Sequence, residues 1–330
     1  MLSARLLEAA VENCLEPTLL TLDANKVAAA LPYDQLIDAL RVAFRGDYQV
    51  PLRSHQDVAL PDGNPGTLLL MPAWKVGNSI GIKIATVFPD NAQQSLPAVF
   101  ASYVLLSATT GEPTAFMDGT ELTLRRTAAA SALASSYLSR AEASTLLMVG
   151  TGNLAPHLVR AHASARPITD VLVWGRRREA AEKLCDQLGS SSLSVTVADD
   201  LEQAVARADI ISCATLASEP LIQGKWLKPG QHVDLVGAFK PEMREADSEA
   251  VARSEVYVDT KSGALAEAGD IVQAINDGSI KEADIRGELR DLVSTDRPAR
   301  TSDKSITLFK SVGTAIEDLA AAELAVRNRG

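Results

Sequence analysis

An alternation of short apolar runs and amphipathic stretches begins near Leu146 and constrains the fold most strongly. The run LLMVG leads into LAPHLVRAHASA, VLVWG into RREAAEKLCDQLG and VTVA into DLEQAVARA, and the runs IISCAT and HVDLVGA follow. Near-continuous apolar runs of this length are typical of parallel strands buried on both faces, and the stretches between them have helical spacing. We therefore predict an α/β fold, with a Rossmann-type doubly wound parallel sheet over residues 126–304.

The segment before this sheet has a different pattern. The stretch DQLIDALRVAFRG predicts an amphipathic helix, and the apolar runs PLRSHQDVAL, TLLLMPAWK, SIGIKIATVFP and AVFASYVLLS follow it as candidate strands. Turn-forming sequences such as PDGNPG and TGEP separate them. We expect a separate α+β domain in residues 1–125, with an antiparallel or mixed sheet. The closing segment 305–330 ends in a long helix that is expected to complete this domain.

Composition excludes several classes of protein. A formal net charge of −10 leaves no basic face for nucleic acid or an anionic membrane. No apolar run reaches the roughly 18 residues that a membrane-spanning helix needs. Cys14, Cys185 and Cys213 form no CxxC pair, so we expect no disulfide, no metal site and a reduced, cytoplasmic setting. The first residues, MLSARLLEAAVENCLEP, predict a short amphipathic helix rather than a signal peptide.

A glycine loop stands between the first run and the first helix of the parallel unit. Gly150 permits a tight turn, Gly152 lets the backbone approach a pyrophosphate, and Ala155 allows close packing of helix and strand. The helix that follows presents free N–H groups and a positive dipole end to an anion. In this context the GxGxxA pattern predicts a dinucleotide site.

The end of the second strand indicates which dinucleotide binds. A site that prefers NADH usually has a carboxylate there for the ribose hydroxyls. Here VLVWG ends in Gly175 and is followed by Arg176, Arg177 and Arg178. Three arginines at a helix N-terminus oppose the helix dipole unless an anion binds between them. We therefore expect NADPH, with NADH as the second candidate.

Three basic residues could hold a substrate. Arg53 and Arg126 could bind a carboxylate in bidentate fashion, although spacing alone does not separate them from ordinary surface charges. Lys83 interrupts an apolar strand, GIKIATVF, and a lysine there can hydrogen-bond to or protonate a nitrogen. The local sequence leaves all three open as candidates.

Taken in order, these segments resemble the ornithine cyclodeaminase/mu-crystallin family. The resemblance is carried by LLLMPAW, KIATVFPDN, TGEPTAFMDGTELTLRRTAAASALAS, GTGNLA, VDLVGAFKPEMREAD, VDTKSGALAEAGDI and LFKSVG, and it covers nearly the whole chain. It implies a homodimer of two-domain subunits, in which the first domain, completed by the C-terminal helix, binds substrate and dimerises.

The resemblance also assigns roles. Arg53, Lys83 and Arg126 match substrate-carboxylate and active-site positions, with Lys83 as the catalytic residue and Phe239 beside the substrate. The cofactor positions expected in this chain are Thr86, Arg126, Thr127, Gly150, Thr151, Gly152, Asn153, Leu154, Gly175, Arg176, Arg177, Thr215, Leu216, Val236, Gly237 and Ser311.

One position departs from the family's cyclodeaminases, which carry a catalytic aspartate in a VGGD-type motif. The matching stretch here is VGAF, and the phenyl ring of Phe239 can neither act as a base nor stabilise an ammonium leaving group by charge pairing. Ornithine cyclodeamination is therefore disfavoured, and Phe239 is expected to pack against a small ring. The resemblance then favours reduction of Δ1-pyrroline-2-carboxylate to L-proline, and of Δ1-piperideine-2-carboxylate to L-pipecolate, by NAD(P)H.

Two alternatives remain. One is an alanine dehydrogenase-like enzyme that aminates open-chain pyruvate reductively. The other is a mu-crystallin-like protein that binds NADPH and a small ligand without turnover. Retention of Arg53, Lys83 and Arg126 disfavours the binding-only alternative.

Overall fold

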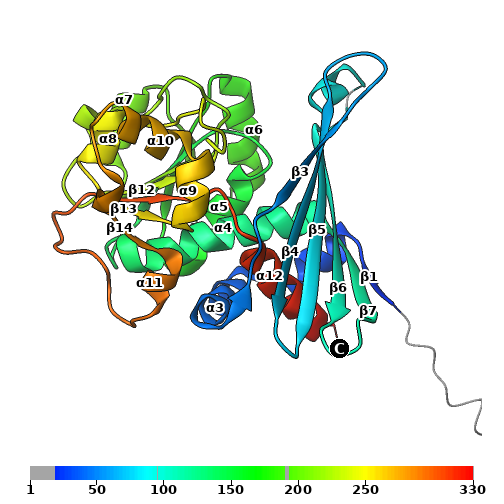
Figure 1. The fold of residues 1–330 in the computed structure, drawn as a ribbon. Helices are drawn as coiled ribbons and strands as arrows, with labels where there is room; N and C mark the ends of the chain where they lie inside the picture. The colour runs from blue at the N-terminus through cyan, green and yellow to red at the C-terminus, as the bar shows by residue number, and fades with distance from the viewer. Residues whose placement is uncertain (1–18, 95, 190–192, 330) are drawn as a thin grey trace, which may run out of the picture.

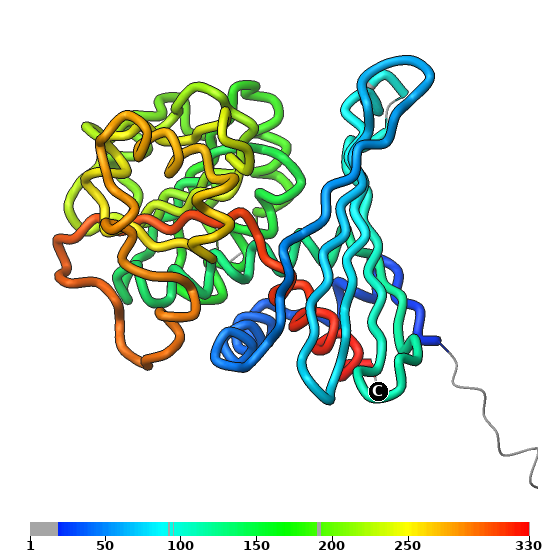
Figure 2. The backbone as a smooth tube through the Cα atoms, in the orientation of Figure 1, coloured from blue at the N-terminus to red at the C-terminus, as the bar shows by residue number. Residues whose placement is uncertain are grey.

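The computed structural model describes residues 19–94, 96–189 and 193–329 and shows two domains side by side (Figures 1 and 2). The helix predicted in the first residues, and Cys14 within it, lie outside this range. No helix among the described residues is long and apolar enough to cross a membrane.

The first domain is built on a mixed sheet with the order β1-β7-β6-β5-β4-β2, in which β3 also pairs with β4. Its strands are β1 (Leu20–Leu22), β2 (Tyr48–Gln49), β3 (Ser54–Val58), β4 (Gly66–Lys75), β5 (Ser79–Val87), β6 (Val99–Ser107) and β7 (Pro113–Asp118), with the 3-10 helix η1 (Pro89–Gln94) after β5. The strands predicted in this segment are confirmed. Helices α2 (Ala24–Ala30), α3 (Tyr33–Arg45) and α12 (Ala315–Arg327) pack together with the sheet (Figure 1).

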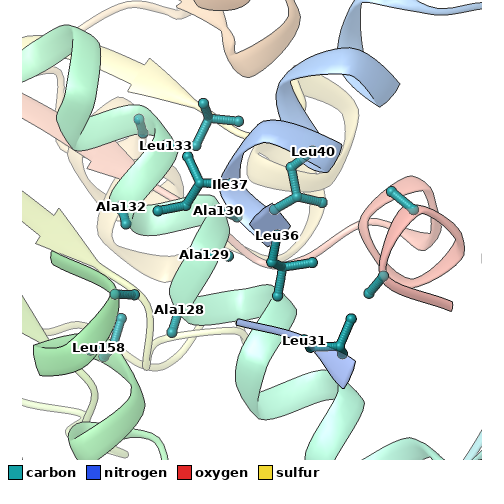
Figure 3. Packing of buried hydrophobic residues seen from close by; sticks show 14 of the residues in the cluster. Leu31, Leu36, Ile37, Leu40, Ala128, Ala129, Ala130, Ala132, Leu133 and Leu158 are labelled. Carbon is teal, nitrogen blue, oxygen red and sulfur yellow. The ribbon is translucent and has the colours of Figure 1, made fainter. Parts of the chain in front are cut away.

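A long helix, α4 (Gly119–Leu138), joins the two domains and packs against both. It begins where the side chain of Asp118 accepts a hydrogen bond from the N–H of Glu121. Its alanine-rich face lets α3 and α5 (Ala155–Ala165) approach closely (Figure 3). Leu36 and Leu40 of α3 are fully buried in this packing, and each contributes roughly 1.5–3 kcal/mol. The domain boundary expected at residue 126 therefore falls inside a continuous helix.

The second domain is built on a parallel sheet with the order β10-β9-β8-β11-β12-β15-β13-β14. Its strands are β8 (Thr145–Val149), β9 (Asp170–Trp174), β10 (Ser194–Val197), β11 (Ile210–Cys213), β12 (His232–Leu235), β13 (Glu255–Val258), β14 (Ile285–Glu288) and β15 (Thr307–Lys310). The helices and 3-10 turns of this part are α5, α6 (Arg178–Leu188), α7 (Leu201–Arg207), η2 (Gly224–Trp226), α8 (Ser248–Ala252), α9 (Lys261–Glu267), α10 (Gly269–Asn276), η3 (Glu282–Asp284) and α11 (Leu289–Val293). The strand order reverses between β8 and β11, so the predicted doubly wound parallel sheet is confirmed.

The end of the chain belongs to both domains. Strand β15 lies between β12 and β13 in the parallel sheet, and α12 then returns to the first domain (Figure 2). The expected boundary between residues 304 and 305 stays a prediction, while β15 itself lies in the parallel sheet and the chain reaches α12 after Lys310. This crossing carries the loop between β15 and α12 past the edge where the parallel strands end.

Candidate active site

The carboxyl ends of the parallel strands gather most of the predicted cofactor residues at one edge of the sheet. The loops that do so follow β8, β9, β11, β12 and β15. They carry Thr151, Gly152, Asn153 and Leu154; Gly175, Arg176 and Arg177; Thr215 and Leu216; Val236, Gly237 and Phe239; and Ser311. In open parallel sheets, ligands bind outside this edge, at the point where the strand order reverses.

The glycine loop lies at that reversal point. Gly150 has a φ of +115°, and a Cβ there would lie 2.5 Å from the carbonyl oxygen of Ala214, which follows β11. A Cβ at Gly152 would meet no described atom within 4 Å, so its backbone faces open space. Helix α5 begins after Leu154 without a side-chain cap among the described residues. The loop thus offers free N–H groups and room for a pyrophosphate, and its residues fit a dinucleotide.

The arginines after β9 flank the same edge. Arg176 and Arg177 are exposed and form no ion pair with any described residue. Arg178, in contrast, pairs with Glu182 and Asp199. Two guanidinium groups are therefore free to bind an anion beside Gly175, whereas the third stabilises the first turn of α6.

Four charged side chains are buried together beneath the first-domain sheet. The Lys83 Nζ atom lies 2.8 Å from Oδ2 of Asp318, and the Arg126 Nε atom lies 2.7 Å from Oδ1 of the same carboxylate. The Arg126 Nη1 atom lies 2.5 Å from Oε2 of Glu317. Lys83 comes from β5, Arg126 from α4 and the two acids from α12. We call these four residues the buried charge cluster.

Burial and mutual charge set the protonation of this cluster. Burial, together with the charge of Arg126, lowers the pKa of Lys83 to about 8, although Asp318 opposes the shift. Burial raises the pKa of Glu317 to about 7 against the opposing charge of Arg126. Burial would also raise the pKa of Asp318, but Arg126 and Lys83 hold it below its usual range. Lys83 can therefore gain or lose a proton near neutral pH.

A glycine connects this cluster to the edge of the parallel sheet. Gly313 follows β15 with a φ of +84°, and a Cβ there would lie 2.7 Å from Nη1 of Arg126. Its carbonyl oxygen accepts a hydrogen bond of 2.6 Å from Nη2 of Arg53. The buried Asp259 accepts hydrogen bonds from the N–H groups of Val312 and Gly313. The two arginines predicted to bind one carboxylate therefore meet at a single turn, which Asp259 holds.

Arg53 also reaches the second domain. Its Nε atom lies 3.5 Å from Oε1 of Glu267 on α9. Arg53 and Glu267 line a cavity of about 450 Å³, together with Asp259, Thr260 and Gly313. Small-ligand sites have volumes of this order and often lie between domains.

Thr86 is not brought to the cofactor edge by any described contact. It follows Lys83 by three positions on β5, and side chains alternate along a strand, so Thr86 lies on the opposite face of the sheet. Thr127 follows Arg126 on α4 and is half-buried. The assignments of individual residues to the cofactor and substrate remain predictions.

Sequence reasoning missed the acidic half of the buried charge cluster. Glu317 and Asp318 lie in the apolar stretch TAIEDLAAAELA, where two adjacent acids interrupt a helix that is otherwise buried. Their partners are about 190 residues away, since Arg126 and Asp318 are separated by 192 positions. The only local signal was the presence of charge where helical spacing predicts a core.

Known proteins share this architecture. The family model for the ornithine cyclodeaminase/mu-crystallin family matches residues 19–329. A Δ1-pyrroline-2-carboxylate reductase of Colwellia psychrerythraea is 40% identical over 309 residues, which cover 92% of this chain and 98% of the relative. The solved structure of Thermococcus litoralis Δ1-pyrroline-2-carboxylate reductase with NADH and L-proline is similar with a TM-score of 0.87 and 33% identity, over 94% of this chain and 97% of that one.

A second solved structure is similar over the same range. It is an archaeal alanine dehydrogenase dimer with bound NAD, with a TM-score of 0.86 and 30% identity over 94% of this chain and 95% of that one. The match of the family model along nearly the full length confirms the resemblance that the ordered motifs carried. This chain belongs to the ornithine cyclodeaminase/mu-crystallin family.

Proposed function

We propose that this protein is an NAD(P)H-dependent reductase of cyclic ketimine acids that converts Δ1-pyrroline-2-carboxylate to L-proline and also accepts Δ1-piperideine-2-carboxylate. The observation that carries the proposal is that Arg53 and Arg126 meet at Gly313, while Lys83 and Arg126 share the carboxylate of Asp318, beside the edge that fits a dinucleotide. Relatives named for this reaction support it.

The chemistry needs a carboxylate clamp, a hydride and a proton. Arg53 and Arg126 hold the substrate carboxylate, since their guanidinium groups flank the same turn. When bound, the reduced nicotinamide supplies the hydride that adds to C2 of the C=N bond. The ring nitrogen takes up one proton, so the product carries CH–NH in place of C=N.

Lys83 is the group suited to orient the imine nitrogen and to hold that proton. It is buried and paired with Asp318, and its pKa of about 8 lets the ammonium release a proton near neutral pH. The two carboxylate oxygens of Asp318 pair with Lys83 and with Arg126, so the spacing of these two cations is set before the substrate binds.

Phe239 supplies an apolar surface in place of an acid. It follows β12 and its side chain is 45% exposed, so it is available to pack against a small ring. A phenyl ring there offers no carboxylate to act as a base or to pair in charge with a departing ammonium, which disfavours cyclodeamination.

We infer that NADPH is the preferred coenzyme. The exposed, unpaired Arg176 and Arg177 next to Gly175 support a 2′-phosphate site. Replacing Arg176→Asp should weaken NADPH binding by roughly tenfold or more while changing NADH binding little, because one charge-assisted hydrogen bond is lost and a repulsion is added. Binding titrations with both coenzymes measure this, and equal losses would contradict a 2′-phosphate site at Arg176.

We further propose a homodimer formed through the outer face of the first-domain sheet. Pro72, Ile82, Val104 and Phe116 are paired across β4, β5, β6 and β7 and form an apolar row on the face opposite Lys83. Phe116 is 41% exposed. A second copy of this chain would cover such a face by packing its own apolar row against it, since a two-fold interface uses the same patch on both subunits. We also propose a cytoplasmic location, in line with the free thiols of Cys185 and Cys213 within the part of the chain that the structure describes.

The dimer is tested with a charge in the centre of that row. Ile82→Arg should give a monomer by light scattering, whereas Val76→Arg in the β4–β5 turn, where Val76 is 74% exposed, should keep the mass of the wild type. A wild-type monomer, or an unchanged mass for Ile82→Arg, would contradict this interface.

One assay tests the proposed reaction. NADPH oxidation is followed with Δ1-pyrroline-2-carboxylate, with Δ1-piperideine-2-carboxylate, and with pyruvate plus ammonia. The proposal predicts rapid turnover with the cyclic ketimines. Turnover confined to pyruvate would instead identify an alanine dehydrogenase, and NADPH binding without turnover would identify a binding protein.

A further inference from the structure

A single buried carboxylate ties together two loops at the edge that fits the dinucleotide. The Glu245 Oε1 atom accepts hydrogen bonds from the N–H and the Oγ1 hydroxyl of Thr215, at 2.6 and 2.9 Å. Its Oε2 atom accepts one from the N–H of Gly237 at 2.7 Å. Thr215 follows β11 and Gly237 follows β12, so Glu245 bridges the loops of adjacent strands.

The two loops touch each other directly. A Cβ at Gly237 would lie 2.0 Å from the carbonyl oxygen of Thr215 and 2.6 Å from Oε1 of Glu245. Only glycine fits there, because the backbone of one loop fills the space that a side chain would need. Leu216 and Phe239 follow within two residues and are 73% and 45% exposed. The placement of these two apolar side chains therefore depends on loops that Glu245 holds.

Glu245 is itself held by charges from two other elements. Asp270 of α10 accepts hydrogen bonds from the N–H groups of Glu245 and Ala246 at 2.6 and 2.9 Å. The fully buried Lys310 of β15 places its Nζ atom 3.1 Å from Oδ2 of Asp270. Burial raises the pKa of Glu245 to about 7, with Lys310 opposing and Asp270 adding to the shift. Burying a carboxylate beside Asp270 costs free energy, and the three hydrogen bonds from Thr215 and Gly237 offset part of that cost.

We propose that Glu245 is a positioning residue for hydride transfer, which fixes the loops of Thr215 and Gly237 so that Leu216 and Phe239 form a rigid wall where the nicotinamide and the ring of the substrate meet. The inference rests on the proposed function for the identity of those ligands. Glu245 acts through the two loops and touches neither ligand itself. Its carboxylate hydrogen-bonds to the loops of Thr215 and Gly237 and makes no described contact with the glycine loop after β8, so we expect its main effect at the nicotinamide end.

The test separates the nicotinamide end from the rest of the cofactor site. Glu245→Gln keeps one acceptor oxygen but places an amide NH2 group against the backbone N–H of Thr215 or Gly237. Glu245→Asp keeps the charge, but its side chain is too short to reach both loops. Glu249→Gln is the matched control, since Glu249 lies on α8 and is half-exposed. Three quantities are measured: kcat with the ketimine, the fluorescence of bound NADPH, and the Kd of 2′-phospho-ADP-ribose, which lacks the nicotinamide.

Both Glu245 variants should lower kcat by roughly tenfold and change the fluorescence of bound NADPH, because a buried hydrogen bond is lost. The Kd of 2′-phospho-ADP-ribose should stay near that of wild type and of Glu249→Gln. An unchanged kcat and fluorescence overturns the proposal. If NADPH and 2′-phospho-ADP-ribose both bind the Glu245 variants more weakly, and by the same factor, Glu245 has a purely structural role and the proposal is overturned. Failure of both variants to fold has the same consequence. Wild-type inactivity toward ketimines contradicts only the proposed function, since the fluorescence readout is independent of substrate.

Discussion

The two halves of the candidate active site are built by different means. The dinucleotide half uses backbone: a glycine at φ +115°, a second glycine facing open space and an uncapped helix start, all within six residues. The substrate half uses buried side-chain charge, with Lys83, Arg126 and Asp318 contributed by elements far apart in the chain. Backbone sites tolerate side-chain changes that keep the loop, whereas charge clusters respond to the loss of any partner.

The largest effect on activity is expected in the substrate half. Lys83→Ala should lower kcat by about 10³-fold, because the imine nitrogen loses its proton-bearing partner. NADPH affinity should change little, because Lys83 lies on β5 and contacts Asp318 rather than the glycine loop. Steady-state kinetics and NADPH titration measure both quantities, with Lys75→Ala on β4 as the control. A large loss of NADPH affinity would argue that Lys83 belongs to the cofactor half.

The same difference explains what the sequence could predict. The glycine loop was predictable because its determinants are contiguous and each glycine has a stated geometric reason. The doubly wound parallel sheet was predictable from the alternation of apolar runs and helices. The cluster of Lys83 with Asp318 was not predictable from spacing, since an isolated lysine in a strand and an acid in a helix carry no information about each other. Arg53, Lys83 and Arg126 were only candidates from the local sequence, and the family resemblance assigned them roles in the site.

The crossing of the C-terminal segment was missed for a related reason. The run ITLFKSVG is apolar enough for a strand, but it gives no sign that β15 inserts between β12 and β13. Strand partners that are distant in sequence are decided by packing of the whole sheet. This insertion is what brings Gly313 between Arg53 and Arg126.

Two glycine substitutions in the dinucleotide half separate the role of the loop in stability from its role in binding. Gly150→Ala should lower the free energy of unfolding by roughly 1–3 kcal/mol, because its φ is positive and the new Cβ meets the carbonyl of Ala214. Gly152→Ala should leave stability unchanged, since no described atom lies within 4 Å of its Cβ.

Both glycine variants should weaken NADPH and NADH alike, by about a hundredfold if the backbone N–H groups hold the pyrophosphate. Denaturant unfolding and coenzyme titration measure the two effects. Wild-type coenzyme affinity in Gly152→Ala would show that the open space at Gly152 does not receive a ligand.

The smallest effect concerns the pKa of Lys83 in the substrate half. Asp318 raises the pKa of Lys83 against burial and Arg126, so Asp318→Asn should lower that pKa below about 8. If the ammonium form of Lys83 is the active one, wild-type kcat/KM falls as pH rises through about 8, and the fall in the variant begins at lower pH. At pH 8 the variant should lose roughly tenfold in kcat/KM and recover part of it at pH 6.

The matched control for this shift is Glu323→Gln, which removes a carboxylate from the same helix where it contacts Ser79 and Tyr48 instead of Lys83. Its profile should follow that of the wild type. A pH-independent loss in Asp318→Asn would mean that Asp318 only supports packing. A shift of the pH profile to lower pH would instead establish that a carboxylate 192 positions from Arg126 sets the charge state of Lys83 in the substrate half.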